Sequence, residues 1–211
     1  MPSKTARYYS YKCLLRHVKR LSPNERSETE LLVDFVTSAV NQLKNPKIAD
    51  LCSGSGCIGF SLAQEIPTST VELWELSKPA IDVLNKNKKL LGFENIKIKN
   101  FDVLSQQSWL DQSFDCIVAN PPYIDASDSD LSKSVKDFEP NIALFAKAGG
   151  LEFYQFFARQ LKVHLKPGGR FFAEMGWKQS EAISLIFKNQ GWNVVLHPDY
   201  SKNIRFIEAF I

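Results

Sequence analysis

The segment with the most specific chemistry in this sequence is Asn120-Pro121-Pro122-Tyr123, which follows the apolar run CIVA. The apolar run is typical of a buried strand, and two prolines directly after it make a stiff corner. In this corner the Asn120 side-chain oxygen and the Pro121 carbonyl can both accept hydrogen bonds from an NH2 group. Tyr123 offers a flat ring to a planar substrate. We therefore predict that Asn120, Pro121, Pro122 and Tyr123 are the catalytic residues.

A corner of this kind suits methyl transfer to the nitrogen of an amide or of an exocyclic amine. The lone pair of such a nitrogen is delocalised, so the group is a poor nucleophile. Hydrogen bonds from its two N–H groups would favour a tetrahedral nitrogen and stabilise the positive charge that develops on it. Most of the acceleration would come from holding donor and acceptor in line, without a general base before transfer. The alternative is that this segment is an ordinary Asn-Pro turn at a strand end, without a catalytic role.

A glycine pattern upstream predicts a nucleotide site. Gly54-x-Gly56-x-x-Gly59 lies between an expected strand and an expected helix, where glycines let the backbone turn tightly and approach a ligand closely. Glu75 ends the next strand, at the spacing where an acid can accept hydrogen bonds from both hydroxyls of a ribose. The alternatives are a packing turn for the glycines and a solvated carboxylate for Glu75.

Two further carboxylates favour S-adenosyl-L-methionine over a dinucleotide. Asp50 lies just before the glycine loop, where a carboxylate is awkward beside a pyrophosphate but suits a cationic sulfonium with an amino group. Asp102 ends the third expected strand, where it can accept hydrogen bonds from the adenine amino group; an ordinary loop aspartate is the alternative. An expected hairpin at the end of the chain also departs from the dinucleotide-binding strand order.

The elements that must position these residues alternate strand and helix, which predicts an α/β, doubly wound sheet. Because no helix separates the last two strands, they should form an antiparallel hairpin at one edge of a mostly parallel, seven-stranded, Rossmann-like sheet. The expected strands are 47–52, 70–76, 95–102, 114–123, 170–176, 192–198 and 205–211. The expected helices are 25–43, 57–66, 78–92, 151–166 and 177–191, with Asn24 or Ser27 capping the first and Ser77 the third.

Composition sets the broad class of the protein. The chain has 211 residues, 44% of them hydrophobic and 23% charged, with a net charge of +3, which is too small to favour direct nucleic-acid or membrane-surface binding. No apolar stretch has membrane-spanning length, and no signal peptide is recognisable. The four cysteines have no zinc-site spacing. We expect a cytoplasmic protein with free thiols, no metal and no membrane segment.

The sequence divides into two parts of different character. Residues 1–23 show no clean period and carry six basic residues, which predicts a basic N-terminal extension. Everything from residue 24 to residue 211 fits a single domain that carries both candidate sites.

These motifs together resemble the HemK/PrmC family, the S-adenosylmethionine-dependent methyltransferases that modify a glutamine side-chain amide in peptide release factors. The matching segments are ETELLV, DLCSGSGCIG, ELS at Glu75, NPPYI, EPNIAL from Glu139, GGLEFY, LKPGGRFFAEMGWKQ and DYSKNIRFIEAF. Only the glycine loop and NPPY are shared widely with other methyltransferases. The other segments are more particular to HemK-like proteins.

The resemblance implies the class I methyltransferase fold, S-adenosyl-L-methionine as cofactor and a peptide chain release factor as partner. It adds Cys52, Ser53, Ser55 and Val103 to the cofactor site and assigns structural support to Glu139 and Glu174. The full expected cofactor set is Asp50, Cys52, Ser53, Gly54, Ser55, Gly56, Glu75, Asp102, Val103 and Asn120. Glu28 and Glu30 fall in the ETE segment expected near the mouth of the site.

Two departures from the family pattern lie near the start of the chain. The family usually has a proline and an arginine before ETE, whereas this chain reads NERS. Bacterial members also carry a helical domain that grips the release factor, and residues 1–23 are too short to form a full one.

Other functions remain open from the sequence alone. An N6-adenine nucleic-acid methyltransferase could use the same NPPY chemistry on a flipped base, although it usually needs a basic surface or an added domain. A ribosomal-protein glutamine methyltransferase and a cofactor-binding partner subunit without turnover are further alternatives. We expect a monomer.

Overall fold

The computed structural model describes residues 28–105, 113–125 and 145–211. The predicted extension 1–23, the capping residues Asn24 and Ser27, and Glu139 lie outside the described residues. The predicted division of the chain at residue 24 therefore stays a prediction.

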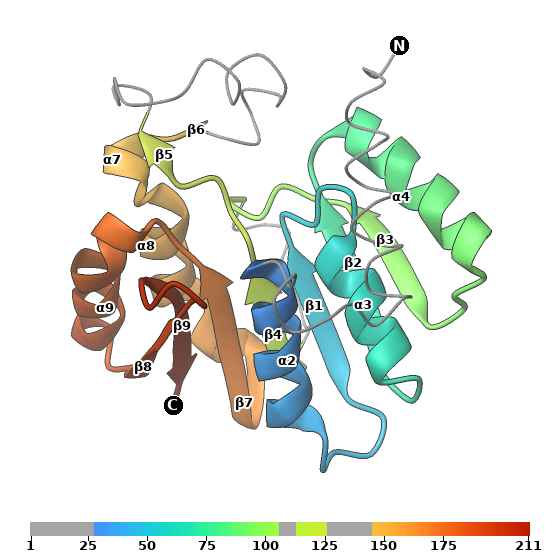
Figure 1. Cartoon of the computed structure of the whole chain (residues 1–211), viewed down its shortest axis with the longest axis horizontal. Helices are drawn as coiled ribbons and strands as arrows, with labels where there is room; N and C mark the ends of the chain where they lie inside the picture. Colours follow the sequence, from blue (N-terminus) through green and yellow to red (C-terminus); the bar gives the residue numbers. More distant parts are fainter. Residues whose placement is uncertain (1–27, 106–112, 126–144) are drawn as a thin grey trace.

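Strand β1 is flanked by two parallel neighbours in the large sheet of the molecule (Figure 1). The sheet has seven strands in the order β3-β2-β1-β4-β7-β9-β8, and the first five run parallel. The strands are β1 (Lys47–Leu51), β2 (Thr70–Glu75), β3 (Ile96–Asn100), β4 (Phe114–Ala119), β7 (Leu165–Glu174), β8 (Asn193–Pro198) and β9 (Ile204–Phe210). Strand β9 is antiparallel to both β7 and β8, so the predicted sheet and its terminal hairpin are confirmed.

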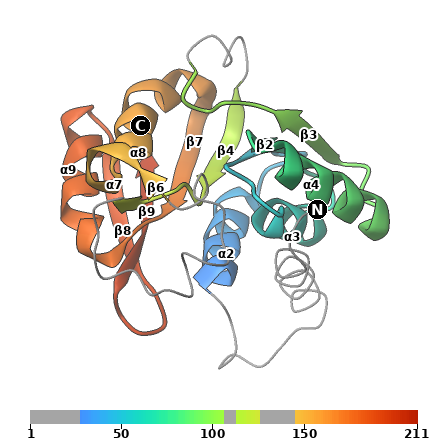
Figure 2. The same ribbon diagram turned by 90° about the horizontal axis from the view of Figure 1, so that it is seen from above.

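Helices cover both faces of this sheet and create two hydrophobic clusters. Helices α2 (Glu28–Val40), α3 (Cys57–Glu65) and α4 (Lys78–Leu91) bury one cluster, and α2 and α3 lie side by side (Figure 2). Helices α8 (Glu152–Gln160) and α9 (Ser180–Asn189) bury the other cluster against the opposite face. The apolar spacing of α2, with Leu32, Val33, Val36 and Val40 all buried, explains why that segment is helical and which face it turns inward.

Three short elements follow β4 in the chain and precede α8. Strands β5 (Ile124–Asp125) and β6 (Phe145–Ala146) pair in parallel, and α7 (Lys147–Gly150) follows them. Inside α7 the residues Ala148 and Gly149 have left-handed backbone angles, so this turn is tight rather than regularly helical.

Two local predictions were wrong. The helix expected over 151–166 ends at Gln160, continues as a 3-10 turn, η3 (Leu161–His164), and becomes strand β7 at Leu165. The Pro167-Gly168-Gly169 segment lies inside β7, where a shift in pairing register accommodates it. Ser77 precedes α4 but its side chain makes no capping hydrogen bond; Pro79 lies in the first turn of the helix, and Gly92 follows its last residue.

Candidate active site

The predicted cofactor and catalytic residues follow the carboxyl ends of four adjacent strands. Leu51, the last residue of β1, pairs with Trp74 on one side and with Ala119 on the other. Glu75 pairs with Asn100 at the end of β3. The parallel strands β1, β2, β3 and β4 end at the same edge of the sheet (Figure 1). The glycine loop, Glu75, Asp102 and Asn120, at or just after these ends, therefore all lie at that edge.

Asp50 is buried beneath the glycine loop with only 1% of its surface exposed. Its Oδ2 accepts a hydrogen bond from the Gly59 N–H at 3.0 Å, whereas no residue that the structure describes donates to Oδ1. Burial, reinforced by the nearby Cys57 and Glu75, raises the pKa of Asp50 to about 8, against the lowering effect of the Gly59 hydrogen bond. A buried carboxyl oxygen without a partner is costly unless a ligand satisfies it.

Two glycines of the loop are required by close packing. A Cβ on Gly56 would lie 2.4 Å from the Phe60 ring, and the residue has a left-handed φ of 86°. A Cβ on Gly59 would lie 2.0 Å from Leu73 Cδ2, so α3 can approach β1 and β2 only with glycine there. Gly54 also has a left-handed φ, of 55°, but a Cβ there would meet no atom within 4 Å.

The loop is held from three directions. Ser53 Oγ donates to the Asp50 carbonyl at 2.6 Å, and the Ser53 N–H donates to the Trp74 carbonyl at 3.2 Å. From α4, the buried Asn87 donates through Nδ2 to the Ser55 carbonyl at 3.0 Å. The loop conformation is therefore fixed by β1, β2 and α4 before any ligand binds.

Glu75 lies directly against this loop. Its Oε2 accepts the Gly54 N–H at 2.8 Å and its Oε1 accepts the Ser77 N–H at 2.7 Å. These two bonds fix the carboxylate at the end of β2, and each oxygen keeps a further lone pair for a donor such as a hydroxyl group. Glu75 thus accepts the N–H of Ser77 itself, while Pro79 leaves no N–H at the second helical position for the Ser77 side chain to accept.

Cys52 and the residues after β3 complete the edge. Cys52 takes a left-handed φ of 57°, and burial, together with Glu75, raises the pKa of its thiol well above the usual range. Asp102 is exposed and its Oδ1 accepts the Leu104 N–H at 3.0 Å. Val103 is 5% exposed and packs into the cluster beneath α8 and α9.

The corner formed by residues 120–123, which we predict to be the catalytic corner, begins directly after β4. Pro121 and Pro122 are buried, while Asn120 and Tyr123 are partly exposed. Asn120 Nδ2 donates to Glu174 Oε2 at 3.0 Å, and no residue in the described parts of the chain donates to Asn120 Oδ1. The amide oxygen therefore receives no hydrogen bond from the described residues.

Glu174 joins the corner to the end of the sheet. This residue ends β7, is 5% exposed, and accepts at Oε1 from Tyr123 Oη at 3.2 Å and from Arg205 Nη2 at 3.2 Å. Arg205 Nη2 also donates to Tyr123 Oη at 3.3 Å. Burial and the neighbouring Glu174 raise the pKa of Tyr123 to about 12, against the opposing effect of Arg205, so its hydroxyl stays protonated at neutral pH.

Gln179 also supports this corner, a role that the sequence analysis did not predict. Its Nε2 donates to the Tyr123 carbonyl at 2.9 Å and to the Gly149 carbonyl at 3.0 Å, and its Oε1 accepts the Gly176 N–H at 3.2 Å. Gly150 packs against the same carbonyl, since a Cβ on it would lie 2.1 Å from the Tyr123 oxygen. Gln179, Arg205 and Gly150 fall in the segments EMGWKQ, NIRFIEAF and GGLEFY, which is the only sequence signal that could have identified them.

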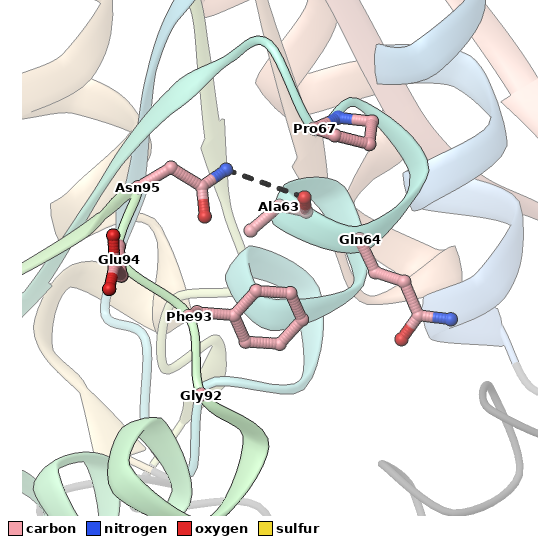
Figure 3. Close-up of a pocket in the computed structure, with 7 residues that line it drawn as sticks. All are labelled: Ala63, Gln64, Pro67, Gly92, Phe93, Glu94 and Asn95. Carbon is pink, nitrogen blue, oxygen red and sulfur yellow. Dashed lines mark hydrogen bonds between the residues drawn. The ribbon is translucent and has the colours of Figure 1, made fainter.

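A hollow elsewhere on the surface is separate from this edge (Figure 3). It lies between the end of α3 and the segment that leads into β3, and therefore at the opposite edge of the sheet from the glycine loop. Its lining residues are Ala63, Gln64, Pro67, Gly92, Phe93, Glu94 and Asn95. Asn95 bridges its walls by donating to the Ala63 carbonyl at 3.4 Å. None of the predicted site residues lines it.

Metal-binding clusters and membrane-spanning helices are both absent from the described residues. No group of histidine, cysteine and acidic side chains there could hold a metal ion. No helix in the described ranges is both long enough and apolar enough to cross a membrane. Cys52, Cys57 and Cys116, the cysteines among the described residues, form no disulfide bond there.

Known proteins match this chain along most of its length. The family model for the methyltransferase small domain matches residues 27–153. The chain is 34% identical over 210 residues to the release factor glutamine methyltransferase of Clostridium acetobutylicum, with 96% of this chain and 74% of that protein covered. Its counterpart in Mycoplasma mycoides is 35% identical over 166 residues, which is 78% of this chain and 59% of that protein.

A solved structure shows the same fold. It is the protein-(glutamine-N5) methyltransferase, release factor-specific, of Alicyclobacillus acidocaldarius. It matches with a TM-score of 0.54 and 23% identity over 90% of this chain and 96% of that one.

The site geometry fits the cofactor of such enzymes. The buried Asp50 has one oxygen that can accept a hydrogen bond from a cationic ligand, and the fixed Glu75 has lone pairs for ligand hydroxyl groups. At Gly54 there is open space next to the loop. The chain therefore belongs to the release factor glutamine methyltransferase family and is an S-adenosylmethionine-dependent methyltransferase.

Proposed function

We propose that this protein transfers a methyl group from S-adenosylmethionine to the side-chain amide nitrogen of a glutamine in a peptide chain release factor. The observation that carries the proposal is the Asn120 amide, whose nitrogen donates to Glu174 and whose oxygen is left for a substrate N–H. The relatives from Clostridium acetobutylicum and Mycoplasma mycoides, both release factor glutamine methyltransferases, support the choice of substrate.

The cofactor would be held along the edge formed by β1, β2 and β3. Asp50 would face its positive charge, Glu75 its ribose hydroxyls, and Asp102 with Val103 its adenine. The loop from Cys52 to Gly56 would give close backbone approach. Bound S-adenosylmethionine supplies an electrophilic methyl group on a sulfonium centre, and the chemistry left to the protein is placement of the acceptor nitrogen.

The corner would place that nitrogen. Asn120 Oδ1 and the Pro121 carbonyl accept the two N–H groups of the substrate amide, and the Tyr123 ring lies against its plane. The nitrogen lone pair forms the new N–C bond while the C–S bonding pair stays on sulfur, and the nitrogen then releases one proton to water. Two accepted hydrogen bonds stabilise the charge that develops on nitrogen before that proton leaves.

We assign residues 24–211 to the catalytic domain and the basic segment 1–23 to an extension outside it. The target we propose is the glutamine of the Gly-Gly-Gln loop of the release factor, reached by a cytoplasmic, monomeric enzyme. A glutamine side chain has no charge and one planar amide, so two acceptor oxygens and an aromatic ring match its recognition needs.

The test uses labelled S-adenosylmethionine with separate samples of release factor, ribosomal proteins and DNA. We expect label in the release factor that disappears when the glutamine of its Gly-Gly-Gln loop is replaced by alanine. Label confined to ribosomal proteins would show that the target glutamine lies in a ribosomal protein and not in a release factor. Label confined to DNA would replace the proposal with N6-adenine methylation, and cofactor binding without any labelled substrate would indicate a partner subunit.

A further inference from the structure

We infer that Glu174 is a positioning residue that sets the orientation of the Asn120 amide, so that oxygen rather than nitrogen faces the substrate. The inference deepens the proposed function and rests on it to the extent that the acceptor is an NH2 group. Nothing in the NPPY segment itself fixes this orientation, because an asparagine amide turned by 180° occupies nearly the same volume.

The fixing contact comes from the neighbouring strand. Glu174 Oε2 lies 3.0 Å from Asn120 Nδ2, and an ionised carboxylate can only accept hydrogen bonds. It therefore selects the Asn120 rotamer that turns Nδ2 toward it. A turned amide would bring Oδ1 against the carboxylate, with two acceptors facing each other in a site where Glu174 is 5% exposed.

Two other residues hold the Glu174 carboxylate in place. Arg205 Nη2 and Tyr123 Oη both donate to Oε1, at 3.2 Å each, which leaves Oε2 for Asn120. The Glu174 and Arg205 side chains are 6% and 14% exposed, so the ion pair is well shielded from water. The hydrogen bonds converge on Glu174: Arg205 and Tyr123 donate to Oε1, and Asn120 donates to Oε2. Asn120 Oδ1 is then left to accept from the substrate.

Glu174→Gln replaces a group that only accepts hydrogen bonds by an amide that also donates, without changing side-chain size. If the new amide donates to Asn120, the Asn120 amide must turn and present its NH2 to the substrate NH2. If the new amide instead accepts from Asn120, its own NH2 must face the Arg205 guanidinium. We expect kcat for the amide substrate to fall about 100-fold, the scale of losing one preorganised group, with less than a threefold change in the Kd of S-adenosylmethionine.

A compensating change separates positioning from general structural damage. In the double variant Asn120→Asp with Glu174→Gln, the new glutamine can accept from Arg205 and Tyr123 and donate to one oxygen of the carboxylate introduced at position 120. The other oxygen of that carboxylate then accepts from the substrate, and the net charge of the three positions 120, 174 and 205 is unchanged. We expect the double variant to recover at least tenfold of the kcat that Glu174→Gln loses.

Asn120→Asp alone supplies a readout that does not depend on the stability of Glu174→Gln. Two carboxyl groups then face each other beside Arg205, and they can share the contact only when one is protonated. We expect the activity of this variant, divided by that of the parent at each pH, to rise as the pH is lowered from 8 to 6. A flat ratio would overturn the inference.

Glu208→Gln is the matched control. Glu208 is also a buried carboxylate, 8% exposed, with an arginine partner, Arg170, and lies within β9 against β8. We expect it to lower the melting temperature about as much as Glu174→Gln and to leave kcat within about threefold of the parent. Equal loss of kcat in both variants, or no recovery in the double variant, would overturn the positioning role.

Failure of the inference can be told apart from failure of the proposed function. If the parent protein labels DNA or a ribosomal protein instead of release factor, the proposed function fails, and the same proteins are then assayed on the substrate that is labelled. The inference predicts the same order of activities on any NH2 acceptor: parent, double variant, Glu174→Gln.

Discussion

Among the acidic residues of the site, Asp50 combines deep burial with an oxygen that receives no hydrogen bond from the described residues. Its pKa, raised to about 8, means that a large fraction of Asp50 is protonated at neutral pH before a cation binds. A cationic ligand favours the ionised carboxylate, so cofactor binding should release a proton from Asp50. The affinity for the cofactor should therefore depend on pH.

We expect the affinity for S-adenosylmethionine to increase by up to tenfold per pH unit from pH 6.5 toward 8. The amino group of the ligand, with an ordinary pKa of about 8, then loses its charge, so the affinity should fall again above that range. Asp50→Asn should bind more weakly at pH 8 and lose the acidic limb of the curve. Calorimetric titration from pH 6 to 9 measures this, and an acidic limb preserved in Asp50→Asn would contradict the assigned contact.

The same pKa predicts a pH-dependent stability of the free protein. Asp50 binds its proton up to about pH 8 when folded but only to about 3.8 when unfolded, so its contribution to stability is fully present below 3.8 and is lost as pH rises through 8. Relative to Asp50→Asn, the parent should lose up to about 1.4 kcal/mol of unfolding free energy per pH unit within this window. Urea unfolding of both proteins at pH 5.5, 6.5 and 7.5 measures the difference; parallel profiles would contradict it.

Removal of the acceptor at residue 120 should affect chemistry far more than cofactor binding, because Asn120 is one of ten residues expected to line the cofactor. Asn120→Ala loses the oxygen that would accept a substrate N–H, and we expect kcat to fall by about 100- to 1000-fold. The Kd of S-adenosylmethionine should change less than threefold, because Asp50, Glu75 and the loop are intact. If affinity for the cofactor falls as far as turnover, Asn120 holds the cofactor and not the acceptor.

Helix α3 is the element whose placement decides the shape of the cofactor edge. Its start is set by Gly56 and its close approach to β1 and β2 by Gly59, where an added Cβ would meet the fully buried Leu73 at 2.0 Å and Asp50 Oδ2 at 2.9 Å. Neither neighbour can move freely, since one lies in the core and the other carries the buried carboxylate. The position of α3 relative to Asp50 therefore depends on the absence of a side chain at Gly59.

Gly59→Ala should push α3 outward and disturb Asp50. We expect a loss of about 1–3 kcal/mol of unfolding free energy from overpacking and at least a ~10-fold weaker binding of S-adenosylmethionine, equivalent to about 1.4 kcal/mol. The control is Gly92→Ala after α4, where φ is +72° but no atom lies within 4 Å of the added Cβ. That variant should lose stability through backbone strain alone and keep its cofactor affinity. Equal cofactor affinity in the two variants would show that the α3 contact does not shape the site.

Sequence patterns predicted the elements that carry the glycine loop and the NPPY corner because those signals are local. Alternating strand and helix with turn residues at the boundaries fixes a parallel sheet, and parallel strands bring Asp50, Glu75 and Asn120 to one edge. The predicted end of the helix that became α8 was wrong, because the apolar pattern of residues 161–166 fits a helix as well as a strand. Pairing of β7 with β4 decides in favour of the strand from Leu165 onward. The predicted cap at Ser77 was wrong: Pro79, at the second position of α4, has no N–H to donate to the Ser77 side chain.

The supports of the catalytic corner could not be deduced from spacing. Glu174, Gln179 and Arg205 contact residues 31 to 82 positions away in the chain. Only pairing of β7 with β4 and with β9 brings them together. Structural support by Glu174 was expected only from the family resemblance, and nothing in the sequence indicated its partners.

At the scale of the whole molecule, both hydrophobic clusters, as far as the described residues define them, are built between residues 31 and 209. Sheet, helices and catalytic corner all belong to this body. We therefore expect it to fold and bind cofactor without the basic residues of the extension.

A variant that begins at residue 24 tests this division. We expect its melting temperature to lie within about 2 °C of the parent, which is ~0.5 kcal/mol for a domain of this size, and its Kd for S-adenosylmethionine to be unchanged. If the extension aids docking of the release factor, the KM for that substrate should rise while kcat stays the same. Loss of folding or of cofactor affinity would place the extension inside the catalytic domain.

The contacts between Asn120 and Glu174, between Glu174 and Arg205, and between Arg205 and Tyr123 span 54, 31 and 82 positions of sequence. A partly assembled molecule that lacks β9 lacks the guanidinium and hence the charge that orders the acceptor. The methyl-transfer activity of a refolding mixture therefore measures the fraction of molecules in which β9 is in place. The fluorescence of Trp74 on β2 can recover earlier. A lag of enzymatic recovery behind fluorescence would time the insertion of β9 between its two neighbours.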